Sequence, residues 1–269
     1  MDAIPSRSTG VVVGPVRAVM LVVEKQWTWY RRNWRSTAIS SFLQPVLFLL
    51  AMGFGFGSQV QPGAVTGGHS YLVYLAPALL VVTTVQNATW ESTYPVLSSF
   101  IWQKSYWGAV VTPVTPAQIF YAQLTWIGLR LVSSALVYVA VAAALGAVGG
   151  PGVLLAVPFA VLAGLAFAAP VVAFSATRDG AEGFTGLFRF VVIPMTLFTG
   201  AFFPITQLPG WLRPVAWVTP MWHGVELARG AAFGTLRLVP ALGHIGYLLV
   251  MGAVGVVLGR KYFRRRLAV

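Results

Sequence analysis

The sequence predicts an all-α integral membrane protein with six transmembrane helices and both termini in the cytoplasm. Of its 269 residues, 57% are hydrophobic and 9% are charged, whereas soluble domains carry roughly 25% charged residues. Apolar runs of about 20 residues, the length that crosses a bilayer, recur along the whole chain. Basic residues gather before the first run and after the last, and the positive-inside rule places such segments in the cytoplasm. The expected location is the plasma (inner) membrane, as a multi-pass protein.

The placement of charge also decides how the net charge of +12 is interpreted. With six spans, 14 Lys and Arg lie inside, if Arg189 near the inner end of the fifth span is included, and 3 lie outside (Arg213, Arg229 and Arg237), while Arg130 lies deep within a span. This asymmetry is typical of a membrane orientation signal rather than of a nucleic-acid-binding surface. Membrane lipids are therefore expected as partners, and nucleic acid is not. The chain has no cysteine, so the redox compartment stays open.

The chain is predicted to divide into a tail of residues 1–13 and one transmembrane domain of residues 14–269. The tail and an amphipathic segment precede the first span. The tail does not resemble a cleaved signal peptide, because the basic segment that follows it is long and no short apolar run ends at a cleavage-like site. It is expected to be a mobile tail. In residues 15–35, apolar side chains recur at steps of three and four, which predicts an amphipathic helix too charged to span. This interface helix is expected to lie along the cytoplasmic membrane surface, with its arginines on anionic lipid or on a partner. In the alternative, its charged face is solvated and only sets the topology.

The first two spans are predicted at about 37–57 and 71–93. The loop between them, 58–70, contains no Lys or Arg, which places it outside. Three glycines at the end of the first span allow close helix contact or fraying: Gly53, Gly55 and Gly57.

Three polar residues occupy the later half of the second span: Gln86, Asn87 and Glu91. Polar groups within a span usually face protein or a water-filled cavity. Glu91 is interpreted either as a capping or network carboxylate or as a substrate contact.

Residues 94–115 are too polar to span, and Lys104 places them in the cytoplasm. Trp102 and Trp107 either anchor this segment at the membrane interface or contact a partner. Thr115 is followed by Pro116 and then by Gln118, a pattern that predicts a capping box with proline at the first helical position. The third span is therefore predicted from residue 116 to about 145.

The last three spans are predicted at about 153–176, 184–203 and 241–259. Pro158 and Pro170 predict kinks in the fourth span. A short cytoplasmic loop, 177–183, follows it. After the fifth span, prolines and tryptophans break an apolar stretch that reaches to Pro240, which is expected at the outer edge of the membrane.

Arg130 lies some 14 residues into the third span, about 20 Å along the helix at ~1.5 Å per residue. A charge at that depth costs at least ~2.5 kcal/mol unless it is paired. Glu91 is predicted near the inner surface, so depth argues against it as the partner and favours Glu226 in the outer region. Arg130 is expected either to pair within the helix bundle or to meet an anionic headgroup of a substrate.

Several chemistries lack their usual residues in this sequence. The chain has no His-Glu-x-x-His motif, no cysteine ligand and no close pair of carboxylates within a span, so neither a catalytic site nor a metal site is predicted. None of its lysines, Lys25, Lys104 and Lys261, follows a glycine as a phosphate-binding loop requires. No cofactor is expected in this chain, and any ATP and Mg²⁺ would be bound by another subunit.

A series of short motifs runs through the chain in a fixed order: Leu75-Ala76-Pro77, Glu91, Thr112-Pro113-Val114-Thr115-Pro116, Thr199-Gly200-Ala201-Phe202-Phe203-Pro204, Leu208-Pro209, Trp211-Leu212, Thr219-Pro220 and Glu226-Leu227-Ala228-Arg229. Together they resemble the type-2 ATP-binding-cassette exporter permeases, a family that includes permeases for drugs, O-antigen polysaccharides and nodulation-type lipo-oligosaccharides. Each motif is weak alone, but their order and spacing make the resemblance specific over nearly the whole chain.

The resemblance implies roles for particular residues. The interface helix would touch a cytoplasmic ATPase subunit, residues 96–112 would be a coupling helix seated in a cleft of that ATPase, and the 178–182 loop would make a lesser contact. Residues 208–232 would form two short re-entrant helices that close the exit. The implied ATPase contacts are Arg31, Arg32, Phe100, Ile101, Trp102, Lys104, Trp107, Arg178 and Asp179. The implied gate residues are Phe202, Phe203, Pro204, Pro209, Trp211, Pro220, Glu226 and Arg229.

The expected function is that of the membrane permease subunit of an ATP-driven exporter for an amphipathic or lipid-linked substrate, such as a drug, a lipid or a lipo-oligosaccharide. Half-size permeases of this family act as dimers, so a homodimer or a heterodimer with a related permease is implied, together with separate ATPase subunits. One alternative is an ATP-independent secondary transporter, which should carry ionisable residues deep in several spans, where this chain offers chiefly Arg130. Another is a membrane-embedded enzyme acting on lipids, which would need clustered His or Asp at one face of the membrane.

Overall fold

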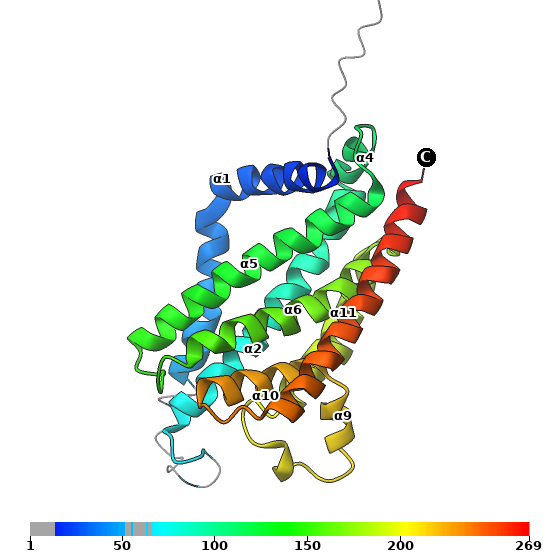
Figure 1. Cartoon of the computed structure of the whole chain (residues 1–269). Helices are drawn as coiled ribbons and strands as arrows, with labels where there is room; N and C mark the ends of the chain where they lie inside the picture. Colours follow the sequence, from blue (N-terminus) through cyan, green and yellow to red (C-terminus); the bar gives the residue numbers. More distant parts are fainter. Residues whose placement is uncertain (1–13, 52–54, 56–62, 64–65, 269) are drawn as a thin grey trace, which may run out of the picture.

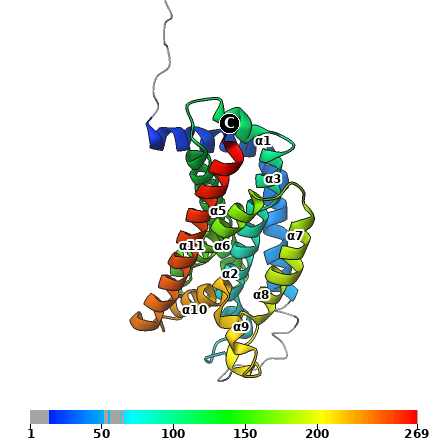
Figure 2. The same ribbon diagram turned by 90° about the vertical axis from the view of Figure 1, so that its right-hand side faces the viewer.

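The computed structural model describes residues 14–51, 55, 63 and 66–268, with the side chains of 33–46 left aside. Throughout this part of the chain the regular elements are helical. Long tilted helices form a bundle, and short helices lie at both of its ends (Figures 1 and 2). The tail predicted at 1–13 lies outside the described residues, as do Gly53 and Gly57 at the end of the predicted first span.

In chain order the elements are α1 (Pro15–Leu50), α2 (Tyr71–Ser92), α3 (Tyr94–Phe100), α4 (Ser105–Val110), α5 (Pro116–Ala144), α6 (Val153–Ser175), α7 (Glu182–Leu187), the π-helical η2 (Phe188–Val192), α8 (Ile193–Phe198), the 3₁₀ turn η3 (Ile205–Gln207), α9 (Arg213–Trp217), α10 (Pro220–Ala232) and α11 (Leu238–Leu267). The end of the bundle that carries α3, α4 and the close of α11 is called the α4 end. The opposite end, which carries α9 and α10, is called the α9 end (Figure 1).

Four helices within the described residues are long and apolar enough to cross a membrane: α2 together with α3 (Tyr71–Phe100), α5, α6 and α11. They lie where four of the six spans are predicted. The predicted fifth span corresponds to the shorter succession α7, η2 and α8, which ends before Gly200, a glycine in the left-handed conformation (φ 74°). The chain after Gly259 contains no glycine or proline, so α11 continues through the basic residues to Leu267.

The interface helix and the first predicted span form one continuous helix, α1, rather than two separate helices. No glycine or proline occurs between residues 30 and 44 to interrupt the backbone hydrogen bonds. Figure 1 shows the first part of α1 lying across the α4 end, after which the helix turns down along the bundle. An amphipathic portion and an apolar portion therefore share one backbone, so a displacement of the first would act directly on the second.

Small residues let the bundle pack closely around α6. A Cβ atom added to Gly164 of α6 would lie 2.7 Å from Cδ1 of Leu131, and one added to Gly224 of α10 would lie 2.7 Å from Cβ of Ala163. In lipid, where burial between helices brings little hydrophobic gain, such close backbone approach is a main source of helix association. α6 also runs through Pro158 and Pro170 without ending.

The predicted caps and breaks explain where the short elements begin. The side chain of Thr115 accepts a hydrogen bond from the Gln118 amide (3.3 Å), and the Gln118 side chain accepts one from the Thr115 amide (2.8 Å), which confirms the predicted capping box. At the α9 end, the side chain of Thr219 caps α10 by accepting one hydrogen bond, from the Trp222 amide (3.3 Å). The predicted re-entrant region 208–232 contains α9 and α10, and both have proline in their first turn.

Candidate functional site

The α4 end carries a helical hairpin made of α3, a turn and α4, in place of one helix over residues 96–112. Lys104 adopts a left-handed conformation in the turn (φ 50°), and Trp102 next to it is 63% exposed. Trp107 is also exposed, although its Nε1 donates a hydrogen bond to the Phe100 carbonyl (3.2 Å). Ile101 is half-buried beside them. The turn and the start of α4 therefore leave a cation and two indole rings exposed at this end.

Phe100 belongs to the same predicted set but is buried. Its ring centroid lies 4.8 Å from that of Tyr106 in α4 and 5.1 Å from that of Phe263 in α11. This aromatic cluster joins both arms of the hairpin to the last helix of the bundle. Phe100 therefore holds the hairpin in place instead of presenting a contact surface.

Two further predicted contacts lie in the loop after α6. Asp179 is 97% exposed and accepts a hydrogen bond from Nη2 of Arg266 (3.0 Å). Nη1 of Arg266 also donates to the carbonyls of Ala176 (2.8 Å) and Arg178 (2.6 Å), so α11 fixes the start of the loop. The guanidinium of Arg178 lies 4.6 Å from the centre of the Phe174 ring.

The first part of α1 crosses the same end of the molecule. Its predicted contact residues, Arg31 and Arg32, are both exposed. Lys25, almost two turns earlier, is exposed as well, although partial desolvation lowers the pKa of its amine from the usual value. All three cations are therefore accessible at this end.

A polar network connects the hairpin and the interface helix to the bundle, with Gln123 of α5 at its centre. Its Oε1 accepts hydrogen bonds from Nε2 of Gln26 in α1 (3.0 Å) and from the hydroxyl of Tyr106 in α4 (2.9 Å). Its Nε2 donates to the backbone carbonyl of Glu91 in α2 (3.4 Å). Burial raises the pKa of Tyr106, which keeps the hydroxyl protonated as a donor. One buried amide therefore joins four helices.

Two turns further along α5, Arg130 completes the network and corrects a prediction. Its Nη2 lies 2.9 Å from Oε1 of Glu91, so Glu91 is its partner and Glu226 is not. Glu91 was predicted too near the inner surface. The helical chain continues past Glu91 through α3 to Phe100, and α5 crosses the bundle obliquely (Figure 1). The two groups therefore meet at one depth. The guanidinium also lies 4.7 Å from the ring centre of Tyr30 in α1.

The remaining polar residues of the second predicted span lie on α2. Nε2 of Gln86 donates a hydrogen bond to the hydroxyl of Thr196 in α8 (3.3 Å), which joins α2 to the helices of the predicted fifth span. Asn87 is half-buried on the same helix. Gln86 thus belongs to an interhelical contact, as expected for a polar group inside a span.

At the α9 end, Arg229 of α10 holds the break after α8. Its two terminal nitrogens donate to the carbonyls of Gly200 (2.7 Å) and Ala201 (2.5 Å). The guanidinium lies 3.9 Å from the ring centre of Tyr74 in α2. The backbone carbonyls that follow the end of α8 are thus satisfied by a charged group from a different helix.

The other predicted gate residues differ in exposure. Phe202 packs near Phe48 of α1 (ring centroids 6.0 Å apart), and its carbonyl accepts a hydrogen bond from the Tyr71 hydroxyl (3.2 Å). Trp211 is 76% exposed. The remaining members are half-buried (Phe203 and Pro204), exposed (Pro209 and Glu226) or buried (Pro220).

A histidine pair at this end was not predicted, because His223 and His244 are distant in sequence. Their Nδ1 atoms lie 2.8 Å apart, and Nε2 of His223 lies 2.9 Å from the Trp217 carbonyl. Since a carbonyl only accepts, Nε2 of His223 is the donor, and one proton is shared between the two Nδ1 atoms. The pair joins α9, α10 and α11. Burial lowers the pKa of His223 from its usual value, the Trp217 carbonyl raises it to a lesser degree, and His244 lowers it.

Sequence reasoning also missed the network residues Gln26, Tyr106 and Gln123. A signal for Gln123 was present, because it precedes Arg130 by two helical turns and shares its face. Gln26 and Tyr106 carried no such signal, because they belong to segments whose position against α5 is set only by tertiary packing.

Comparison with known proteins gives consistent results. The model of the ABC-2 type transporter family matches residues 17–233. Nodulation protein J of Rhizobium meliloti (strain 1021) is 30% identical over 251 residues, which cover 90% of this chain and 94% of that protein. Nodulation protein J of Bradyrhizobium diazoefficiens is 30% identical over 258 residues, covering 93% of this chain and 97% of that protein.

Proposed function

Because the chain belongs to the ABC-2 type transporter family, we propose that it is the membrane permease subunit of an exporter driven by a separate cytoplasmic ATPase. The family is one of transporter permeases rather than of enzymes, and the four apolar helices make the chain a multi-pass membrane protein. ATP and Mg²⁺ would be bound by the ATPase, since this sequence lacks a phosphate-binding lysine loop. The proposed cargo is an amphipathic or lipid-linked molecule.

The observation that carries this proposal is the α3–α4 hairpin and its connection to the bundle. The turn offers Trp102 and Lys104 to a partner, and the hairpin is joined to α5 through Tyr106 and Gln123. A force applied to the turn would therefore reach a spanning helix through a buried hydrogen bond. We place this end, with both termini, in the cytoplasm, where the basic residues concentrate.

We further propose six spans, with the second part of α1 and the α7–α8 succession as the two that complete the set. α9 and α10 would then form the outer, re-entrant closure of the exit. Two such permease chains, identical or related, and two ATPase subunits would make the exporter. The Gln86–Thr196 hydrogen bond supports a position of α8 within the bundle, beside α2.

The proposal is tested by co-expressing the tagged chain with ATPase subunits encoded near it and purifying the complex from membranes. The expected result is a stable complex that hydrolyses ATP and moves a fluorescent lipid across proteoliposomes in an ATP-dependent manner. The variant Trp102→Ala/Lys104→Ala should lose the ATPase and keep its own fold. Recovery of the permease with no ATPase from wild-type membranes would overturn the proposal.

A further inference from the structure

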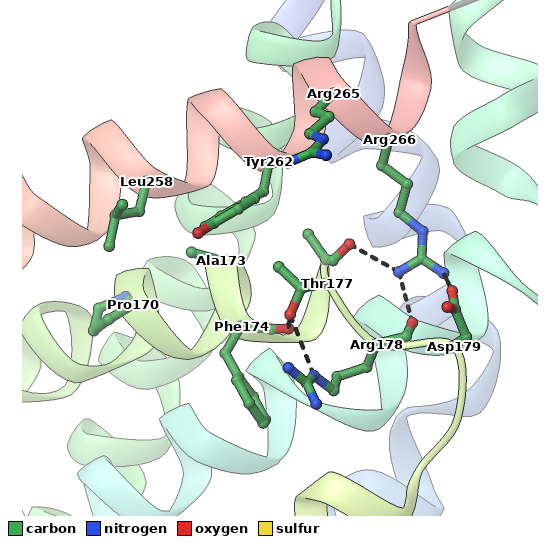
Figure 3. A pocket seen from close by; sticks show the side chains of 11 residues that line it. Pro170, Ala173, Phe174, Thr177, Arg178, Asp179, Leu258, Tyr262, Arg265 and Arg266 are labelled. Atoms are coloured by element: carbon green, nitrogen blue, oxygen red, sulfur yellow. Dashed lines mark hydrogen bonds and ion pairs between the residues drawn. The ribbon is translucent and has the colours of Figure 1, made fainter.

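A cavity of about 750 Å³ lies at the α4 end between the closing turns of α6 and α11 (Figure 3). Its wall on α11 changes from apolar to basic along one face of the helix, from Leu258 through Tyr262 to Arg265. The wall on α6 changes in the same sense, from Pro170 to Arg178 in the following loop. The cavity is therefore apolar toward the membrane core and basic toward the surface.

The charges of the cavity are only partly satisfied within the protein. Arg266 is held by backbone carbonyls and by Asp179. Within the described residues, Arg265 forms no hydrogen bond or ion pair, and Arg178 uses only its Nε, on the hydroxyl of Thr177 (3.2 Å). Figure 3 shows the Arg265 side chain extending from α11 toward the side of the cavity formed by α6. Both guanidinium groups therefore keep N–H donors that are available to an anion.

The apolar side of the cavity opens toward lipid. Leu258 is 36% exposed, and next to it Val254 and Val257 are 53% and 65% exposed on α11. In a membrane protein, a helix face of this composition is covered by acyl chains. Arg260 and Lys261 directly follow this face and mark the level of the headgroups. The cavity thus crosses the boundary between acyl chains and headgroups.

We propose that this cavity binds an anionic phospholipid of the adjacent leaflet. Its phosphate would lie between Arg178 and Arg265, its glycerol region beside Tyr262, and one acyl chain along Pro170 and Leu258. Arg178 turns back over Phe174 into this site, while Asp179 at the loop surface stays accessible to a partner subunit. The inference goes beyond the proposed export function and takes from it only the cytoplasmic placement of this end.

The test uses the full-length chain, purified in detergent without ATPase or ATP and titrated with short-chain phosphatidylglycerol or phosphatidylcholine under native mass spectrometry. Phosphatidylglycerol should bind the wild type more tightly, and Arg178→Gln and Arg265→Gln should each weaken that binding about fivefold. The matched control is Arg264→Gln, which removes an exposed charge of the same helix that does not line the cavity. It should leave binding unchanged.

Competitors distinguish a lipid from other anions. Inorganic phosphate at the same concentration should fail to displace phosphatidylglycerol, because phosphate has no acyl chain to contact the apolar wall. Leu258→Gln should weaken the binding of phosphatidylglycerol but not the binding of phosphate. Equal displacement by phosphate would overturn the proposal, as would an equal loss with Arg264→Gln. Full lipid binding by both Arg178→Gln and Arg265→Gln would overturn it as well. Absence of lipid binding leaves the exporter proposal intact, since no ATPase takes part.

Discussion

Arg130 and Arg229 lie toward opposite ends of the bundle and are held by different kinds of partner. Arg130 pairs with the side chain of Glu91 and stacks on Tyr30, in a network that continues to Gln123. Arg229 donates to two backbone carbonyls just after α8. Side-chain partners from several helices can be exchanged when helices shift, whereas carbonyls fixed at a helix end cannot. We therefore interpret the α4 end as the part that moves and the α9 end as a closure held by a fixed contact.

The largest effect on stability is expected from Arg229→Met. The carbonyls of Gly200 and Ala201 would lose their charged donor, and the free energy of unfolding in detergent should fall by about 3 kcal/mol. Chemical unfolding followed by tryptophan fluorescence measures this. Arg237→Met is the control, because Arg237 is exposed. A loss no greater than that of the control would remove the contrast between the two ends.

A smaller loss, about 2 kcal/mol, is expected for Glu91→Gln, which leaves the guanidinium of Arg130 without its carboxylate. The double variant Glu91→Gln/Arg130→Gln should recover about half of this loss, because no charge then remains unpaired. The same unfolding measurement applies. Strict additivity of the two single changes would show that the ion pair contributes nothing to the network.

Acidification should weaken the α9 end in particular. The pKa of His223 is lowered in the fold, so its contribution to stability is present above the usual value of 6.5 and is lost as the pH falls through the lowered pKa. Protonation of His223 would also leave both Nδ1 atoms carrying a hydrogen, so that two N–H groups would face each other across the contact between His223 and His244. The unfolding temperature should drop by about 2 °C more in wild type than in His223→Phe between neutral and mildly acidic pH.

His69→Gln is the control for the acid effect, because His69 stacks on Phe233 and not on another histidine. This variant should keep the wild-type pH dependence. The interpretation of the histidine pair fails if His223→Phe and wild type lose stability in parallel on acidification.

The smallest effect on stability, close to zero, is expected for Trp102→Ala, since its indole is mostly exposed. The same change should weaken binding of the ATPase subunit about tenfold, as expected for an exposed aromatic anchor. Trp211→Ala removes a similarly exposed indole at the α9 end and should not affect ATPase binding. Equal weakening by both changes would contradict the assignment of the contact surface to the α4 end.

The positions of four spanning helices could be predicted from the sequence because apolar length, proline and capping patterns are local properties. The pairing of Arg130 could not, because it depends on the tilt of α5 and on the continuation of α2 into α3. The hub Gln123 and the pair of His223 with His244 are likewise products of tertiary packing. Motif order indicated a coupling segment at 96–112 and the break after the fifth predicted span, but only the structure shows that this segment is a hairpin, with Phe100 as a buried anchor and Trp102 as a surface residue.

Gln123 is expected to transmit motion from the α4 end to the bundle, and the absence of cysteine from the sequence allows this to be tested with one introduced thiol. A single cysteine introduced by Phe203→Cys reports on the α9 end through its rate of thiol labelling in the reconstituted complex with the ATPase. ATP should change this labelling rate in the otherwise unaltered protein. Adding Gln123→Leu should abolish the change while ATP hydrolysis continues. An undiminished ATP-dependent change in the Gln123→Leu protein would show that Gln123 does not transmit the motion.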